Sequence, residues 1–287
     1  MKLVIGLFYF MDYRRRKQTI IISILAAFFL VVGAWVYFGY FYQGASCFDG
    51  KQNQNETGID CGGVCISCER LTAQDVKISW VRFFSLENNR YDLAAEISNP
   101  NSNFGLGKLN YNFQLKGEDG QTISKSGSAF ILPGQTKYLV EANFDAGQKI
   151  KSISLVLPSI DKNDWQELKS DYDPRTVTLY AKDRQFQYLE SGAAIAQATG
   201  VIKNESSFDF DRVMVSVVLF DADKQVIGVN KTEASTIPSG SERYFSVLWF
   251  EPLPGEVKSL DMLAETNLFA DDNFMSQYGE TEQFQQY

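Results

Sequence analysis

The sequence predicts an all-β protein in which two immunoglobulin-like β-sandwiches follow, in tandem, a single N-terminal transmembrane helix. Three observations lead to this prediction. Residues 19–42 form an uncharged apolar run, short strands rich in Val, Ile, Phe, Tyr and Leu recur after residue 70, and similar segments return at a spacing of about 105 residues.

The apolar run at residues 19–42 predicts the transmembrane helix. At about 1.5 Å per residue the stretch from Thr19 to Phe41 alone reaches roughly 34 Å, which is enough to span a bilayer core. Four cations come directly before it: Arg14, Arg15, Arg16 and Lys17. Because positive residues favour the cytoplasmic side, we expect residues 1–18 in the cytoplasm and the rest of the chain outside the cytoplasmic membrane. The lipid bilayer is therefore the first expected partner.

Two alternatives concern how the N-terminus is processed. A basic region followed by an apolar run is also typical of a cleaved signal peptide, but this run is about twice the usual length, which favours an uncleaved anchor. The segment Gly44-Ala45-Ser46-Cys47 is similar to a lipidation site. It lacks the usual leucine, and Cys47 fits a better pattern.

The four cysteines of the chain all lie in a predicted neck at residues 43–70: Cys47, Cys61, Cys65 and Cys68. An even number of cysteines in a short glycine-rich segment outside the cytoplasm predicts two disulfides, and three pairings remain open. The alternative is a zinc site, since Cys61-x3-Cys65-x2-Cys68 has ligand-like spacing. Zinc, however, requires reduced thiolates and usually two well-separated pairs of ligands.

The neck also carries oxygen ligands that suit calcium. Asp49, Asn53 and Glu56 match part of an EF-hand loop, and Asp60 is a further candidate donor. The match is half complete, because carboxylates are missing from the first places of the loop. The alternative is that these side chains cap tight turns around the neighbouring glycines. We expect the fold to form without a cofactor. If the neck binds a metal ion, calcium is the first candidate and zinc the second.

The whole neck pattern, C-x-D-G-x-x-N-x-x-E-x-G-x-D-C-G-G-x-C-x-x-C, resembles a small cysteine-rich motif of surface proteins of bacteria and archaea. The resemblance covers the stretch from Cys47 to Cys68. It implies a location outside the cell more than it implies an activity.

Strand patterns after the neck predict a first sandwich at 71–158, a linker at 159–176 and a second sandwich at 177–270. The expected strands are 76–84, 91–98, 109–116, 122–130, 136–144 and 150–157, then 193–203, 213–221, 226–236, 242–250 and 257–267. The acidic, Gln-rich tail at 271–287 has no strand pattern. We expect it to be disordered, or else a peptide that docks onto another subunit.

The two sets of strands share turn sequences. The segment from Ile97 to Pro100 corresponds to that from Ile202 to Glu205, and Pro133-Gly134 corresponds to Ser239-Gly240. The offsets stay near 104 to 107 residues, which predicts the duplication of one domain.

The second set resembles the FxLYD and water-stress (late embryogenesis abundant) β-sandwich families. The residues that carry the resemblance are Gly200, Asn204, Leu219-Phe220-Asp221, Gly228 and Ile237-Pro238-x-Gly240. The first set shares the plan more weakly. The resemblance covers about two thirds of the chain and implies binding or spacer modules without a catalytic centre.

Composition excludes several functions. The chain has no histidine, which removes imidazole catalysis and histidine metal ligands, and it carries no nucleotide-binding or hydrolase motif. Because the chain has a net charge of −8, nucleic acid is not an expected partner.

The tryptophans differ in their expected environments. Trp80 and Trp249 lie in strand patterns and are expected in the core. Trp165 lies in the linker and is the tryptophan expected to be exposed for contact with a partner.

These observations predict a membrane-anchored, non-enzymatic binding or assembly protein of the cell envelope, which acts through protein contacts of its sandwiches. The first alternative is a calcium-dependent adhesive or metal-responsive module. The second is a surface carbohydrate binder or hydrolase, for which no pair of catalytic carboxylates can be named.

Overall fold

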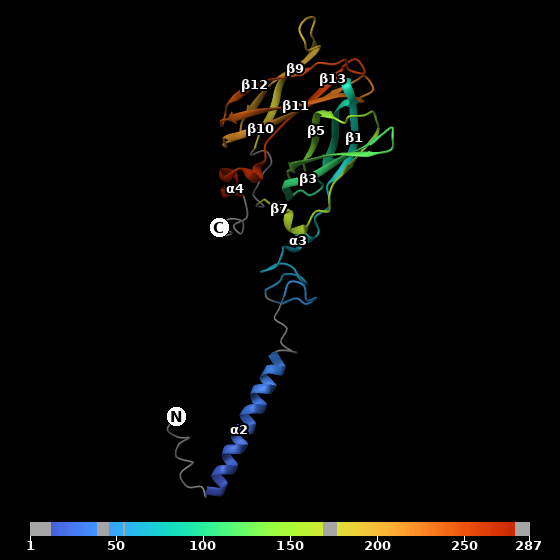
Figure 1. Ribbon diagram of the computed structural model, residues 1–287. Helices are drawn as coiled ribbons and strands as arrows, with labels where there is room; N and C mark the ends of the chain where they lie inside the picture. The colour runs from blue at the N-terminus through green and yellow to red at the C-terminus, as the bar shows by residue number, and fades with distance from the viewer. Residues whose placement is uncertain (1–12, 39–45, 54, 169–176, 279–287) are drawn as a thin grey trace. The chain divides into compact units, whose positions relative to one another are not determined.

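The computed structural model describes residues 13–38, 46–53, 55–168 and 177–278, and the chain divides into two compact units, residues 1–68 and 69–287 (Figure 1). In the first unit, helix α2 (Tyr13–Val36) has 24 residues. The most apolar 18-residue window within Arg15–Val36 has a mean hydropathy of 2.6, and none of that window is buried. By length and composition this helix can cross a membrane. Residues 39–42 of the predicted span lie outside the described residues.

The basic residues that we expect to set membrane orientation lie in the first turns of α2, from Arg14 to Lys17. The hydroxyl of Thr19, one turn later, donates to the backbone oxygen of Arg15 at 2.9 Å. The charged end and the apolar body are therefore parts of one continuous helix.

The second unit contains the β-strands of two sandwiches, including two strands, β7 and β8, that the sequence does not predict. In the first sandwich they are β1 (Lys77–Ser85), β2 (Arg90–Ser98), β3 (Phe104–Gly117), β4 (Thr122–Ile131), β5 (Thr136–Asp145), β6 (Ile150–Val156) and the short β7 (Gln166–Glu167). In the second they are β8 (Leu179–Tyr188), β9 (Ala196–Asn204), β10 (Phe210–Phe220), β11 (Val226–Ile237), β12 (Glu242–Trp249) and β13 (Ser259–Glu265). The short helix α3 (Cys68–Leu71) precedes them.

Both sandwiches have the same topology. In the first, the sheet β1-β2-β5 packs on the sheet β4-β3-β6, and in the second, β8-β9-β12 packs on β11-β10-β13. Every strand pair is antiparallel. The prediction of an all-β fold with two sandwiches after one apolar helix is confirmed.

Alternation of side chains builds each core. In β9, Ala196, Ala198 and Ile202 point inward and are fully buried, while Gln197 and Thr199 point outward. Such a strand places one face in the core and leaves the other face polar. Gly200 is required in this strand, because a Cβ there would lie 2.7 Å from the ring of Phe245.

A buried asparagine closes the same corner of each sandwich, where the sequence predicts a strand end. The Asn204 amide nitrogen donates to the backbone oxygens of Phe208 at 2.8 Å and Ile237 at 3.1 Å, and its oxygen accepts from the backbone nitrogen of Ser206 at 3.0 Å. Asn99 makes the corresponding bonds to Phe104, Leu132 and Asn101 in the first sandwich.

The expectation that Trp165 is exposed is wrong. Trp165 is 0% exposed and belongs to the core of the first sandwich. The residues after it form β7, which pairs with the start of β3 through Phe104 and Gly105. The first half of the predicted linker is therefore part of the first sandwich. Burial of the large apolar ring of Trp165 stabilises this arrangement, because it removes the ring from water. Trp249 is buried, as expected.

The expectation of a disordered tail is wrong for its first part. Helix α4 (Asp272–Tyr278) follows β13, and its Phe274 is fully buried against the core of the second sandwich. The rings of Phe274 and Phe208 are 5.4 Å apart. Asp271 caps the helix by accepting from the backbone nitrogen of Phe274 at 2.8 Å. Residues 279–287 lie outside the described residues.

Candidate functional site

The neck is closed by two disulfides, Cys47–Cys65 and Cys61–Cys68. The first cysteine thus pairs with the third, and the second pairs with the fourth. Gly62 and Gly63 make the turn between the two bonds with backbone φ angles of +78° and +63°. A Cβ on Gly62 would lie 2.0 Å from the hydroxyl oxygen of Thr57, so this turn requires glycine.

Carboxylates hold the loops of the neck together through backbone amides. Asp60 accepts from the backbone nitrogens of Asp49 at 2.9 Å and Gly50 at 3.0 Å. Asp49 accepts from the backbone nitrogen of Lys51 and from the side-chain nitrogen of Asn53, both at 2.9 Å. The bond from Asn53 holds the pKa of the Asp49 carboxyl below its usual range, because it stabilises the charged form.

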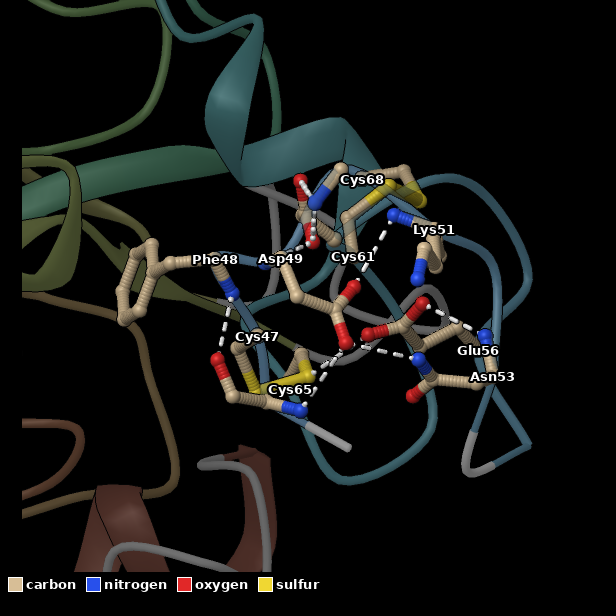
Figure 2. The surroundings of a disulfide bond; sticks show 12 residues. Cys47, Phe48, Asp49, Lys51, Asn53, Glu56, Cys61, Cys65 and Cys68 are labelled. Carbon is tan, nitrogen blue, oxygen red and sulfur yellow. Dashed lines mark hydrogen bonds between the residues drawn. A yellow bond between two sulfur atoms is a disulfide. The ribbon is translucent and has the colours of Figure 1, made fainter. Parts of the chain in front are cut away.

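Three of the four predicted calcium ligands come together beside one disulfide. Figure 2 shows the side chains of Asp49, Asn53 and Glu56 gathered next to the Cys47–Cys65 bond. Glu56 is only 7% exposed and accepts from the backbone nitrogen of Asn53 at 3.0 Å. The side-chain oxygen of Asn53 is buried and has no hydrogen-bond partner among the described residues. Asp60 is instead engaged with the two backbone amides.

The sulfurs of the neck are not available as thiolates. Cys47, Glu56 and Cys65 form the one group of potential metal ligands found among the described residues, with ligand atoms within 4.8 Å of one another. Two of these three atoms are the sulfurs of a single disulfide. A zinc site of the kind that the cysteine spacing suggests would require this bond to be reduced first.

In the second unit, the two sandwiches share an apolar contact. Ala94 of β2 and Val140 of β5 pack with Val218 of β10 and with Val226 and Val229 of β11. Trp80 of β1, expected in the core, is half-buried at this contact and donates to Glu96 at 2.8 Å. The outer face of the sheet β1-β2-β5 therefore packs on the outer face of the sheet β11-β10-β13.

A buried ion pair also joins the sandwiches. The Lys137 amine of β5 lies 2.6 Å from a carboxylate oxygen of Glu265 of β13, and the two residues are 3% and 6% exposed. Gln135 donates to the other Glu265 oxygen at 2.8 Å. Burial lowers the pKa of Lys137 and raises that of Glu265, while the opposite charge of each partner works against the shift. An arrangement that separated the two residues would leave a buried charge without its partner. The intact ion pair therefore favours one arrangement of the two sandwiches.

A third contact brings the chain after β13 onto β3. The 3-10 turn Leu268–Ala270 places Phe269 over Gly105 and Gly107, where an added Cβ would lie 2.7 to 3.0 Å from Phe269 atoms. The side-chain nitrogen of Asn267 donates to the backbone oxygen of Gly107 at 2.9 Å. Glycines in this stretch of β3 therefore permit close approach of the second sandwich.

A cleft of about 920 Å³ opens beside these contacts. Lys137 and Glu265 lie in its wall, and its other lining residues come from both sandwiches and from the start of α4. Besides Glu265, four more carboxylates line it from the second sandwich: Asp209, Asp211, Asp271 and Asp272. Asp209 and Asp271 already accept backbone hydrogen bonds, from Ser239 and Phe274, which gives each of them a structural role.

Comparison with known proteins adds little to this description. No protein-family model and no curated protein sequence matches the chain. One matching solved structure is the N-terminal CBM22-1-CBM22-2 tandem domain from Paenibacillus barcinonensis Xyn10C, at 10% sequence identity, over 68% of this chain and 84% of that chain. Its TM-score is 0.15, which is too low to support an argument about fold or function. The chain is accordingly characterised by its own architecture, an apolar helix, a disulfide-closed neck and two joined β-sandwiches.

Proposed function

We propose that this chain is a membrane-anchored, extracytoplasmic binding or assembly protein of the cell envelope, which acts through protein contacts of its paired sandwiches and not as an enzyme. In this proposal α2 is the signal anchor, and its basic start lies in the cytoplasm. The two disulfides support an oxidising compartment for the rest of the chain.

The observation that carries the proposal is the joining of the two sandwiches. The apolar contact and the Lys137–Glu265 pair hold them in one arrangement, so their free surfaces are presented at fixed positions. A binding surface that is already organised loses less entropy when a partner binds.

The outer face of the sheet β8-β9-β12 is the surface best suited to a protein partner. Tyr244 is 62% exposed there, beside Val201, which is its register partner on β9. Lys182 and Lys203 flank the tyrosine and both pair with Glu242. An exposed aromatic residue with a charged rim is typical of protein interfaces.

Cross-linking in native membranes tests the proposal. A lysine-reactive cross-linker followed by mass spectrometry is expected to join Lys182 or Lys203 to another envelope protein. Lys116 and Lys151, on the opposite sandwich, serve as internal controls of general reactivity. Membranes in which no lysine of the chain is joined to any protein neighbour would count decisively against this function.

A second candidate function is calcium binding in the neck, which would make the protein a metal-responsive or adhesive module. The observation that favours it is the unpaired Asn53 oxygen beside the Asp49 and Glu56 carboxylates. Calorimetry on the full chain in detergent should then show calcium heat that Glu56→Gln abolishes. The absence of heat at millimolar calcium would end this candidate.

A further inference from the structure

The neck places most of its large apolar side chains on the outside. Three of the four, Phe48, Ile59 and Val64, are 91%, 63% and 70% exposed, whereas the carboxylate-bearing Glu56 is 7% exposed. Folding normally does the reverse, because burying apolar area stabilises a domain and burying a carboxylate costs free energy. The two disulfides therefore hold together a small module whose apolar side chains remain exposed.

Two of these side chains lie in tight turns that backbone bonds hold in place. Ile59 lies in a turn that a β-bridge between Gly58 and Cys61 closes. Val64 lies in the next turn, which a 3.0 Å hydrogen bond from the backbone nitrogen of Cys65 closes. Such turns usually carry Gly, Pro, Asn, Asp or Ser, because those residues suit the backbone geometry. Exposed isoleucine and valine at these places therefore point to a contact outside the neck.

Two further bonds hold Phe48 close to the other two residues. The Cys47–Cys65 disulfide joins the residue before Phe48 to the residue after Val64, and its Cα atoms are 5.5 Å apart. The carboxylate that follows Ile59 accepts from the backbone nitrogen that follows Phe48, at 2.9 Å. Figure 2 shows the ring of Phe48 turned away from the disulfide. We call these three side chains of one small module the apolar tips: Phe48, Ile59 and Val64.

The bilayer is the nearest apolar medium along the chain. The predicted span ends at residue 42, and the described part of the neck begins at Ser46. At no more than about 3.6 Å per residue, the chain between these two residues covers at most about 14 Å. The headgroup region on one side of a bilayer is itself about 5 to 8 Å thick. A connection this short keeps the neck at the membrane surface.

Exposed apolar groups of this kind mark a contact with a protein or with a membrane, and the short connection favours the membrane. Lys51 and Arg70 are the only cations of the neck, so attraction to anionic headgroups would contribute little. We propose that the apolar tips insert into the outer surface of the bilayer and so dock the neck on the membrane. This inference rests on the signal anchor proposed above and adds a second contact with the same bilayer.

Photo-cross-linking of the full chain in phosphatidylcholine nanodiscs tests the inference. Photoreactive benzoylphenylalanine replaces one residue at a time: Phe48, Ile59 or Val64, then Trp35 of α2 as the membrane reference, and Phe250, which is 60% exposed in the second sandwich, as the control. Mass spectrometry after irradiation measures lipid adducts. We expect each apolar tip to give at least tenfold more adduct than Phe250. Salt at about 0.5 M should leave these yields unchanged, because no ion pair is involved.

Alkylation with and without prior reduction checks that both disulfides have formed in each labelled chain. The inference is overturned if Trp35 gives lipid adducts while the apolar tips give no more than Phe250, and that result leaves the anchor standing. Cross-links from the apolar tips to a second copy of the chain in place of lipid also overturn it, because they would identify a protein interface. A lack of adducts at Trp35 as well would contradict the proposed anchor itself.

Discussion

At the scale of single residues, a buried asparagine joins separate turns in each of the two sandwiches. Asn204 is fully buried and satisfies backbone groups from two turns at once. The sequence predicted a turn at Asn204 and at Asn99 from residue type alone. It did not show that both side chains are buried, because burial depends on loops that are distant in sequence.

Replacing Asn204 tests this role. Asn204→Ala leaves the backbone oxygens of Phe208 and Ile237 and the nitrogen of Ser206 without their partner. We expect the free energy of unfolding to fall by about 2–4 kcal/mol, measured by chemical denaturation. Asn103→Ala, at an exposed position, is the control and should change it by less than about 0.5 kcal/mol. An equal effect of the two substitutions would refute the role of Asn204.

The Lys137–Glu265 pair makes a different prediction. Lys137→Met leaves the Glu265 carboxylate buried without its cation, and we expect a loss of about 3–5 kcal/mol in stability. The double variant Lys137→Met, Glu265→Leu removes both charges and should recover most of that loss. Chemical denaturation of the parent, the single variant and the double variant measures these differences in stability. A double variant as unstable as the single one would mean that packing, and not charge, accounts for the effect.

Asp92 predicts a pH dependence. It is buried in β2, and burial raises its pKa, although the backbone nitrogen of Asn143 donates to it at 2.7 Å. The folded protein therefore binds the proton more tightly than the unfolded chain. Stability should fall as pH rises from the unfolded value of about 3.9 through the raised folded pKa, by about 1.4 kcal/mol per unit of difference.

Asp92→Asn does not titrate and should lack this contribution. Compared at each pH, the variant should gain stability over the parent as pH rises through that window and match it below the window. Thermal melts from pH 3 to pH 8 measure the difference. A variant whose stability falls in parallel with the parent across this range would show that the titrating group lies elsewhere.

At the scale of elements, regular alternation was enough to predict most strands. The segment 122–130, for example, became β4 (Thr122–Ile131) almost unchanged. β8 (Leu179–Tyr188) was missed because its register shifts between Lys182 and Gln185, and Asp183 has a positive φ of 53°, which breaks the alternation. Short β7 was missed because its pairing depends on β3, more than fifty residues away.

Helix α4 was missed for a related reason. It has only seven residues, and its polar sequence hides the apolar side chains Phe274, Met275 and Tyr278. A helix this short is not stable alone, so packing on the second sandwich must stabilise it.

The contribution of α4 can be measured. Phe274→Ala removes a fully buried ring from the second core, and we expect a loss of about 3–5 kcal/mol in the free energy of unfolding. Ser276→Ala, at an exposed position of the same helix, is the matched control and should have little effect. If both variants unfold like the parent in denaturant, α4 does not belong to the folded domain.

At the scale of the whole molecule, the contact between the sandwiches was the feature that sequence reasoning overlooked. A signal for it exists, because Leu93-Ala94-Ala95 in β2 and Val217-Val218-Leu219 in β10 are continuous apolar runs. Such runs indicate a strand that is buried on both faces. Which two faces meet could not be predicted, since the register of one sandwich against the other is set by three-dimensional packing. The pairing of the four cysteines could not be predicted either, because it depends on how the neck folds in three dimensions. The structure shows the pairs Cys47–Cys65 and Cys61–Cys68.

The central claim is that one helix anchors the chain and presents the joined sandwiches outside the cytoplasmic membrane. Labelling of intact cells with a membrane-impermeant lysine reagent, followed by mass spectrometry, tests it most directly. Lys116, Lys151 and Lys224 are exposed in the sandwiches and should be labelled on intact cells, whereas Lys17 should be labelled only after the cells are broken. Labelling of Lys17 on intact cells, with the sandwich lysines protected until lysis, would contradict the account.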